Sequence, residues 1–318
     1  MRVLFIFLDG VGIGADDPLV NPFARADMPS LRRLLGGRPL VAAAFSPGGE
    51  APPRFGLLFE GDGASLLALD AGMGVPGLPQ SASGQATLLT GINIPAAIGY
   101  HYGPKPDRAV AGHLRNGNLF DTLLLNGRRA ALLNAYPPGY FKAIESGRRL
   151  FSAIPLAVTS AGLPLMNAQD LNAGRSLSAD ITGQGWRERL GLPDTPLITP
   201  YQAGERLAHL SLDYDLAFFE YWLSDYAGHQ QDMPAALDLL NTLDQVLASL
   251  VGSWEDGSLI LVTSDHGNLE DLSTRRHTAN PVPALLIGPL PLRRSFSQNL
   301  SDLTGITSAI LKFLGVSV

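Results

Sequence analysis

Short, continuous apolar runs that lead into a carboxylate are the feature of this sequence that most restricts its fold. A run of this kind, without polar alternation, is typical of a strand covered on both faces, as in a largely parallel sheet. One of the three runs, Leu216–Leu223, fits either a strand or a helix. The runs and the carboxylates that follow them are Val3–Leu8 with Asp9, Leu216–Leu223 with Asp225, and Ser258–Thr263 with Asp265.

Helical patterns lie between these runs. Apolar residues recur at three- and four-residue steps from Ala236 to Leu250, and Leu303–Leu314 has a similar pattern before Gly315. Alternating strands and helices predict an α/β fold, a three-layer α/β/α sandwich with a mostly parallel central sheet. Ligands of such sheets bind beyond the carboxyl ends of the strands, where the three carboxylates stand.

The middle of the chain has a different character. It is rich in Gly, Pro and Asn, with only short periodic segments, and it has no strand that leads into a carboxylate. We therefore predict a discontinuous catalytic core, residues 1–95 and 205–318, with a smaller inserted α/β cap at 96–204 as the substrate domain. The Pro-, Gly- and Ala-rich segment 38–54 is predicted to be a surface excursion.

Composition narrows the class of protein. With 46% hydrophobic residues, the 318-residue chain can bury a large core, and a net charge of −6 with scattered basic residues argues against a nucleic-acid partner. The absence of cysteine removes disulfides and thiolate metal sites. The opening apolar run is too short for a secretion signal or a membrane helix, so we expect a cytoplasmic protein without a membrane partner.

Two clusters are weak signals when taken alone. Asp9 enters a glycine-rich turn that ends at Gly14, as many strand–turn units do. Asp225 and His229 are four residues apart, so in a helix they would share one face, although a capping Asp and a surface His would look the same.

A third cluster indicates metal binding. Asp265 and His266 directly follow a predicted strand, and His277 comes a short loop later. Buried Asp and His side chains are costly without a partner, and a divalent cation satisfies both. The oxygen and nitrogen donors suit Mn, Zn, Mg or Fe and argue against a structural zinc knot. The candidates are too many for one ion, and two ions about 4 Å apart would use them.

Ser81 is the candidate nucleophile. It precedes the predicted helical segment Ala86–Leu89, and the free N–H groups of a helix N-terminus favour an alkoxide or a phosphorylated group. A plain N-cap serine is the alternative.

Together, these motifs resemble the alkaline phosphatase superfamily, most closely the branch of cofactor-independent phosphoglycerate mutase and phosphopentomutase. The resemblance covers residues 1–95 and 205–318 in the family's order. Four segments carry it: Ser81-Ala-Ser-Gly-Gln-Ala-Thr-Leu-Leu-Thr-Gly91, Asp225-Tyr-Ala-Gly-His229, Ser264-Asp-His-Gly-Asn268, and His277-Thr-Ala-Asn-Pro-Val-Pro283.

The resemblance implies a metal-dependent enzyme with two divalent ions and a phosphoserine intermediate at Ser81. One ion would be held by Asp225, His229 and His277. The other would be held by Asp9, Asp265 and His266, with the Ser81 hydroxyl coordinated to it. A metal-bound hydroxyl has a lowered pKa, so an alkoxide can exist near neutral pH.

The chain also departs from the family. The mutases' Asp-Gly-Arg-Asp and Asn-Phe-Arg segments, which hold phosphoglycerate, are absent, and the insert is shorter. Gln85 stands where sulfatase chemistry would need Arg. Cationic candidates for substrate binding follow the nucleophile, although such charges are more often a solvated face. They are His101, Lys105, Arg108, His113 and Arg115.

We therefore expect a phosphatase acting on a small phosphorylated metabolite. Without a clamp that retains the dephosphorylated product, water would take the phosphoryl group more readily than an isomerising substrate. The alternatives are a phosphomutase acting on phosphoglycerate or a sugar phosphate, and a non-catalytic metal-binding homologue. The sequence specifies neither the substrate, nor the native metal, nor the oligomeric state.

Overall fold

A seven-stranded mixed sheet forms the centre of the protein. The computed structural model describes residues 1–46, 54–254 and 257–317. Strands β4, β7, β1 and β8 run parallel, whereas β8, β9, β3 and β2 pair antiparallel. In sheet order the strands are β2 (Gly56–Glu60), β3 (Ala64–Leu69), β9 (Val282–Ile287), β8 (Leu259–Thr263), β1 (Val3–Leu8), β7 (Leu216–Tyr221) and β4 (Ala130–Leu132).

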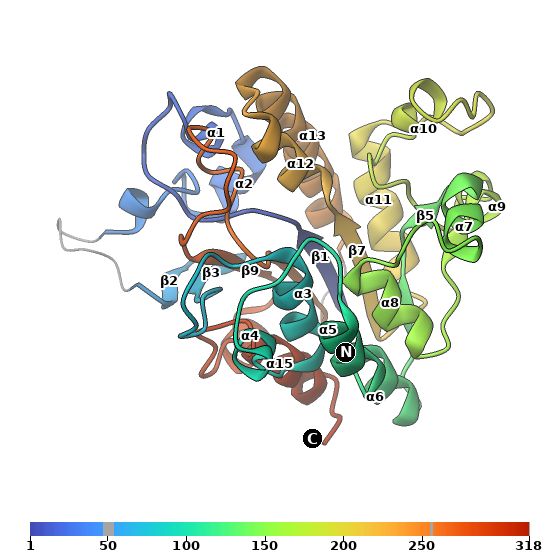
Figure 1. Cartoon of the computed structure of the whole chain (residues 1–318). Coiled ribbons are helices and arrows are strands. Elements are labelled where there is room, and N and C mark those ends of the chain that lie inside the picture. Colours follow the sequence, from blue (N-terminus) through green and yellow to red (C-terminus); the bar gives the residue numbers. More distant parts are fainter. Residues whose placement is uncertain (47–53, 255–256, 318) are drawn as a thin grey trace.

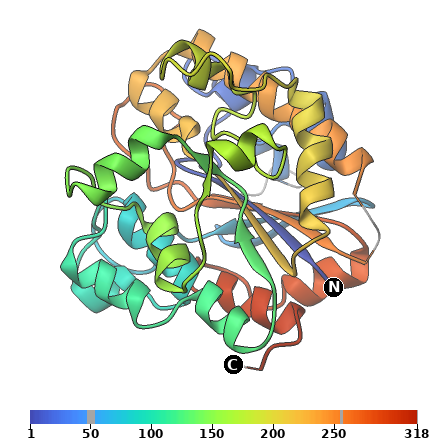
Figure 2. The same ribbon diagram turned by 90° about the vertical axis from the view of Figure 1, so that its right-hand side faces the viewer.

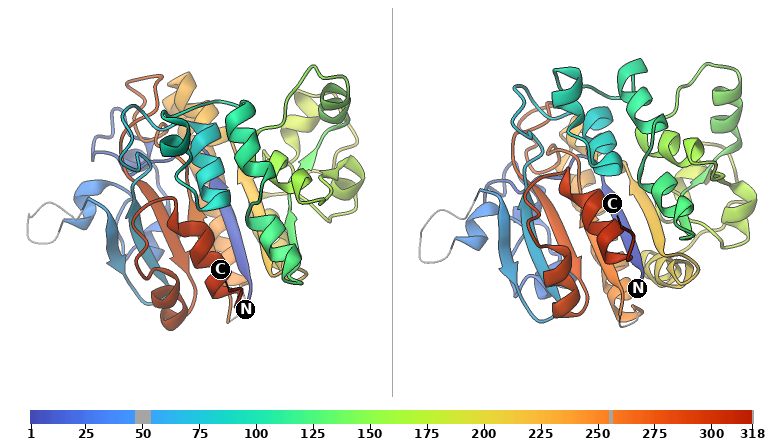
Figure 3. Two further views of the ribbon diagram at one scale, coloured as in Figure 1. Left: turned by 60° about the horizontal axis from the view of Figure 1, so that its bottom comes forward. Right: turned by 90° about the horizontal axis from the view of Figure 1, so that it is seen from below.

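Helices cover both faces of the sheet, which makes the predicted α/β fold a sandwich of three layers (Figures 1 and 3). One face carries α3 (Ser81–Thr90), α4 (Ile94–Ile98), α5 (Arg108–Arg115), α6 (Leu119–Leu125), α8 (Ala153–Ser160), α14 (Leu290–Phe296) and α15 (Gly305–Phe313). The opposite face carries α1 (Pro22–Arg25), α2 (Pro29–Leu34), α11 (Pro200–Ser211) and α13 (Met233–Gly252).

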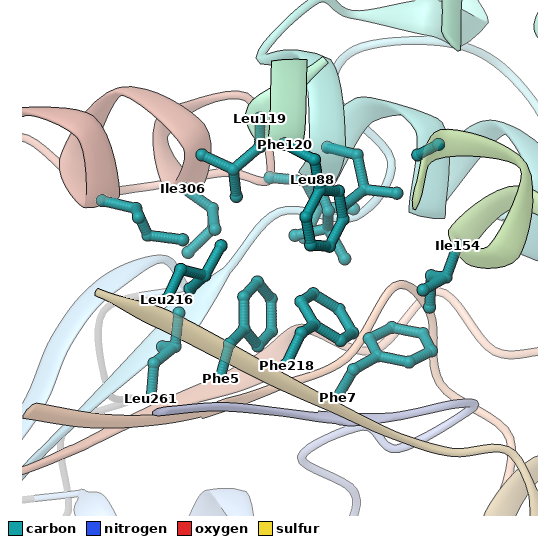
Figure 4. Close-up of a cluster of buried hydrophobic side chains, with 14 of the residues drawn as sticks. Phe5, Phe7, Leu88, Leu119, Phe120, Ile154, Leu216, Phe218, Leu261 and Ile306 are labelled. Carbon is teal, nitrogen blue, oxygen red and sulfur yellow. The ribbon is translucent and has the colours of Figure 1, made fainter. Parts of the chain in front are cut away.

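Alternation along the buried strands supplies both cores. In β1, Phe5 and Phe7 face the α3 side, and Leu4 and Ile6 face the α13 side. The Phe5 ring lies 4.4 Å from the ring of Phe218 on the neighbouring strand, and these aromatic side chains fill the space under α3 and α6 (Figure 4). Because apolar layers cover the sheet on both sides, polar side chains gather where the strands end.

The sequence predicts either a strand or a helix for the apolar run 216–223. In the structure, residues 216–221 form strand β7, and helix α12 (Leu223–Gln230) follows directly. The two predicted helices are confirmed as α13 and α15, and Gly315 takes a left-handed φ of 71° just beyond α15. Within the described part of the chain, no helix is both long and apolar enough to cross a membrane.

Much of the predicted insert belongs to the main layers. Strand β4 extends the central sheet beside β7, and α5, α6 and α8 pack into the same core as α3. β4 is only three residues long, which is why its pattern is hard to read. For the elements that lie outside the central sheet, the inserted cap domain remains a prediction. These are β5 (Ala135–Tyr136), α7 (Pro138–Glu145), β6 (Met166–Asn167), α9 (Ala168–Asn172) and α10 (Gln184–Glu188), at one side of the molecule (Figure 2).

The predicted surface excursion at 38–54 is only partly described, because residues 47–53 lie outside the described residues. Its first part contains a short 3-10 turn, Ala42–Phe45. The side chains of Leu40, Val41 and Phe45 are buried, so this part packs against the protein.

Candidate metal centre

Three adjacent parallel strands deliver the carboxylates to one edge of the sheet. Asp9 directly follows β1, Asp265 follows β8, and Asp225 lies in the first turn of α12, just after β7. In the sheet, β1 lies between β7 and β8. The carboxyl ends of these strands therefore meet at one place, as expected from the carboxylate that follows each apolar run.

Asp9, Asp265 and His266 form the first candidate metal group, which we call the inner triad. His266 Nε2 lies 3.3 Å from Asp9 Oδ1 and 3.5 Å from Asp265 Oδ2. Asp265 and His266 are fully buried.

Ser81 lies beside the inner triad, but it is carried by a helix and not by a strand end. It is the first residue of α3, and its Oγ lies 3.0 Å from His266 Nε2. The N-cap is Gln80, so the reading of Ser81 as a plain N-cap is wrong. The hydroxyl stands at the positive end of a ten-residue helix, beside the buried carboxylates.

Asp225, His229 and His277 form the second candidate group, the outer triad. Asp225 and His229 share one face of α12, as their spacing predicts, with Asp225 Oδ2 3.2 Å from His229 Nε2. His277 Nε2 approaches Asp225 Oδ1 to 3.6 Å from the loop before β9.

Backbone carbonyls orient all three histidines. Nδ1 of His229 lies 2.7 Å from Arg275 O, Nδ1 of His277 lies 2.8 Å from Pro79 O, and Nδ1 of His266 lies 3.4 Å from Gly267 O. A carbonyl only accepts, so each Nδ1 is the donor and each Nε2 faces its triad, where it could offer its lone pair to a bound cation. This arrangement is the one that metal-binding histidines adopt.

The two triads are neighbours. The rings of His266 and His277 stack with centroids 3.7 Å apart. Gly10, which has a left-handed φ of 68°, packs so tightly that a Cβ there would lie 2.6 Å from Asp225 Oδ1. Only glycine fits this turn, so the glycine-rich segment after β1 brings the two groups together.

The inner triad is short of positive charge. Burial, together with the neighbouring Asp265 charge, raises the pKa of Asp9 well above its usual range, and burial also raises the pKa of Asp265. Burial lowers the pKa of His266, but the charges of Asp265 and Asp9 outweigh it and raise that pKa to about 10. Burial and the nearby His266 lower the pKa of His277 to about 4.

The donor atoms fit divalent ions. Ligand atoms about 2.1 Å from a shared ion lie roughly 3 to 3.5 Å from one another, and the contacts of His266 Nε2 with Ser81, Asp9 and Asp265 span 3.0 to 3.5 Å. Asp9 Oδ1 is buried and has no hydrogen-bond partner in the described structure. A cation at each triad would compensate the negative charge of the carboxylates, and the cation at the inner triad would give Asp9 Oδ1 a partner.

Gln85 supports the inner triad in a way that the sequence did not reveal. Its Nε2 donates to Asp9 Oδ2 at 3.2 Å and to Asp265 Oδ2 at 3.1 Å. Ionised carboxylates only accept, so the Gln85 amide presents its N–H group to them. One turn after Ser81, Gln85 holds the two like charges in place and leaves Asp9 Oδ1 free.

Glu270 links the loops around the centre and is a second residue that sequence reasoning missed. One carboxylate oxygen accepts from the backbone N–H groups of Gly12 and Asn268, both at 2.8 Å. The other accepts from the Thr278 hydroxyl and, at 3.0 Å, from Asn280 Nδ2. These bonds connect the turn after β1, the turn after β8 and the loop that carries His277.

We expect Glu270→Gln to weaken metal binding by roughly 10- to 100-fold and to lower the free energy of unfolding by about 2 kcal/mol. The side-chain amide introduced by this substitution would point an N–H group at donors that the Glu270 carboxylate accepts from in the original protein. Metal titration by calorimetry and urea unfolding measure the two effects. Asp271→Asn is the matched control, because the Asp271 carboxylate makes a local contact and accepts from Ser273, two residues later. Unchanged metal affinity in Glu270→Gln would contradict the role.

Glu220 is a buried carboxyl close to the centre, on β7. Its side chain is 6% exposed, and Oε2 accepts from the Tyr136 hydroxyl at 3.2 Å. Burial raises the pKa of Glu220 to about 7, and the Asp265 charge adds to this rise.

Because the pKa of Glu220 is higher in the folded than in the unfolded protein, ionisation destabilises the fold as pH rises from about 4.5 to about 7. The difference corresponds to about 3 kcal/mol. Glu220→Gln should therefore match the original protein near pH 4.5 and exceed it by about that free energy at pH 8. Urea unfolding at both pH values, at one metal concentration, tests this. A stability difference that does not change with pH would contradict it.

The predicted substrate-binding cations lie on α5 and on the segment that precedes it. His101 is half-buried, and its Nε2 contacts Val75 O at 3.2 Å. Lys105 follows the segment that lies against the first turn of α3. Arg108, His113 and Arg115 lie on α5, and both arginines are exposed. Substrate contact stays a prediction for all five residues.

Comparison with known proteins agrees with this centre. Residues 203–318 match the family model described as the metalloenzyme superfamily. A 2,3-bisphosphoglycerate-independent phosphoglycerate mutase of Methylobacillus flagellatus is 33% identical over 119 residues, 34% of this chain and 23% of that protein. The mutase of the same name from Halobacterium salinarum is 29% identical over 160 residues, 46% of this chain and 31% of that protein. The matches thus span less than a third of these relatives.

Solved structures share the fold across the whole chain. A protein from Pyrococcus horikoshii aligns with a TM-score of 0.53 and 12% identity, covering 100% of this chain and 97% of that one. The alkaline phosphatase from the Antarctic bacterium TAB5 aligns with a TM-score of 0.51 and 14% identity, covering 100% and 98%. Residues 203–318 thus match the metalloenzyme superfamily, and the similarity of the chain to the cofactor-independent phosphoglycerate mutases is distant and covers part of the chain.

Proposed function

We propose that this protein is a two-metal phosphatase that cleaves a small phosphate monoester through a phosphoserine at Ser81. The observation that carries the proposal is the convergence of the Ser81 hydroxyl on the inner triad, with the outer triad stacked against it. One hydroxyl beside two groups of oxygen and nitrogen ligands is suited to in-line phosphoryl transfer.

In this proposal, Asp9, Asp265 and His266 hold one ion next to Ser81, and Asp225, His229 and His277 hold the other. Oxygen and imidazole donors without sulfur suit Mn, Zn or Mg. The ions supply positive charge that activates the serine hydroxyl and stabilises the charge on the transferring phosphoryl group.

The chain's own groups prepare the attack. Ser81 forms the bond to phosphorus as the P–O bond of the ester breaks and the alcohol leaves, and the N-terminus of α3 favours the negative charge that develops beside it. Gln85 fixes the carboxylates behind the nucleophile. Water then hydrolyses the phosphoserine, releases inorganic phosphate and restores the hydroxyl.

A phosphomutase is the second candidate, because the curated relatives that match the chain carry that name. In a mutase, the dephosphorylated intermediate stays bound and takes the phosphoryl group back. We propose that the small elements around β5 and β6 form a reduced cap over the site. The absence from the sequence of the Arg-bearing segments quoted above favours hydrolysis.

Product analysis tests the proposal. Metal-stripped protein, supplied in turn with Mn, Mg and Zn, should release inorganic phosphate from at least one member of a panel of phosphorylated metabolites. Recovery of an isomeric phosphate ester without free phosphate would favour the mutase. If neither product forms with any metal, the non-catalytic homologue is the remaining alternative and the proposal is overturned.

A further inference from the structure

A cavity of about 80 Å³ lies inside the protein, between helix α13 and the central sheet. Ile6, Leu8 and Val262 line it from strands β1 and β8. Leu243 and Leu247 line it from α13, and every described residue around it is apolar. Helices cover this face of the sheet (Figure 1), yet Leu8 and Val262 are only half-buried, so the surrounding side chains leave part of the space unfilled.

Two neighbouring helices fix the position of α13 above the cavity. The Asp244 carboxylate on α13 accepts from Ser30 N at 3.0 Å and from Leu31 N at 2.8 Å, at the start of α2. Helix α11 packs so closely that a Cβ on Gly204 would overlap the backbone oxygen of Val246. Asp244 is buried, so a shift of α13 toward the sheet would break hydrogen bonds that water does not replace. The cavity is therefore built into the packing of these helices.

The lining of the cavity selects against water. A buried water typically makes about three hydrogen bonds, and the lining side chains offer none. An empty cavity is itself unfavourable, because the atoms that line it lack contacts across the gap. Apolar cavities stay dry and take up small apolar molecules such as benzene or xenon.

The cavity adjoins the metal centre but is separate from it. Leu8 directly precedes Asp9, Val11 follows Asp9 by two residues, and both line the cavity. They face the α13 side of the sheet, whereas α3, which begins with Ser81, covers the opposite side. A molecule in the cavity would contact the turn that carries Asp9 without occupying the space beside the Ser81 hydroxyl.

We propose that this cavity is a binding site for a small apolar molecule, no larger than a single carbon ring. The lining excludes polar ligands, because a polar atom would be buried there without a hydrogen-bond partner. The site does not depend on the proposed function, since its occupation requires no turnover.

Cyclopentane and tetrahydrofuran test the site, because the two rings have the same size and differ by one ether oxygen. Methyl NMR of protein supplied with Mg should show shifts at Leu8, Leu243 and Val262 on addition of cyclopentane, with a dissociation constant of about 1 mM. Tetrahydrofuran should bind at least about tenfold more weakly, because its oxygen loses water and finds no donor. Absence of cyclopentane binding, or equal affinity for the two rings, would overturn the proposal.

Leu243→Phe is the variant that fills the cavity, and it should weaken cyclopentane binding by at least about tenfold, since the larger side chain takes the space of the ligand. Leu239→Phe is the matched control: it lies on the same helix and packs in the same layer, but it does not line the cavity. Its affinity should stay within about twofold of the original. Unchanged affinity in Leu243→Phe would contradict the location of the site.

Xenon locates the site in the original protein, so this measurement does not depend on the folding of a variant. Crystals held under xenon pressure should show an anomalous peak between α13 and strands β1 and β8. A cavity without xenon would overturn the proposal.

Discussion

Replacing Ser81 with alanine is expected to reduce phosphate release by roughly three to five orders of magnitude while both metal sites stay loaded. The hydroxyl is the group that forms the bond to phosphorus, and no other hydroxyl in the described part of the chain is hydrogen-bonded to the His266 ring. The six side chains of the two triads are untouched by the change. Steady-state kinetics and elemental analysis of the same sample measure the two effects.

Ser83→Ala is the matched control for this substitution. Ser83 is also buried in α3, but its hydroxyl donates to Gln80 O and accepts from Tyr102 N. Its loss should cost about 1 kcal/mol of stability and leave turnover within a few-fold. Turnover retained in Ser81→Ala, or lost equally in both variants, would show that Ser81 is not the nucleophile.

Removing the metal ions is expected to abolish turnover and to lower the melting temperature. Without cations, the inner triad keeps two buried carboxylates with only His266 to compensate them. An ion present at 100 times its dissociation constant stabilises the folded state by about 2.7 kcal/mol, so two ions contribute roughly twice this. Thermal unfolding across a metal titration, with activity assayed in parallel, checks both effects.

Asp225→Ala provides the internal control for metal removal, because Asp225 belongs to the outer triad and not to the inner one. This variant should keep about half of the metal-dependent stabilisation. A melting temperature that does not respond to divalent ions in the original protein would contradict a resident metal centre.

The sequence predicts the half of the fold that carries the site. Three buried strands lead into carboxylates, and parallel strands end at a common edge, so the convergence of Asp9, Asp225 and Asp265 follows from local pattern and sheet geometry. Strand β4 is harder to predict, because three residues are too few to show a period. Its partner β7 lies more than 80 residues later.

Support of the site by distant residues was not predictable in the same way. Glu270 looks like an ordinary acidic loop residue, and its role depends on four donors from three segments. Such contacts are set by tertiary packing, which periodicity and propensity do not encode.

Anomalous diffraction from crystals of the Mn-loaded protein tests most directly whether two cations surround one activated hydroxyl. The expected result is two anomalous peaks per chain, one among Asp9, Asp265, His266 and Ser81 Oγ, the other among Asp225, His229 and His277. A single peak at full loading, or an inner ion that Ser81 Oγ does not contact, would contradict the two-metal account.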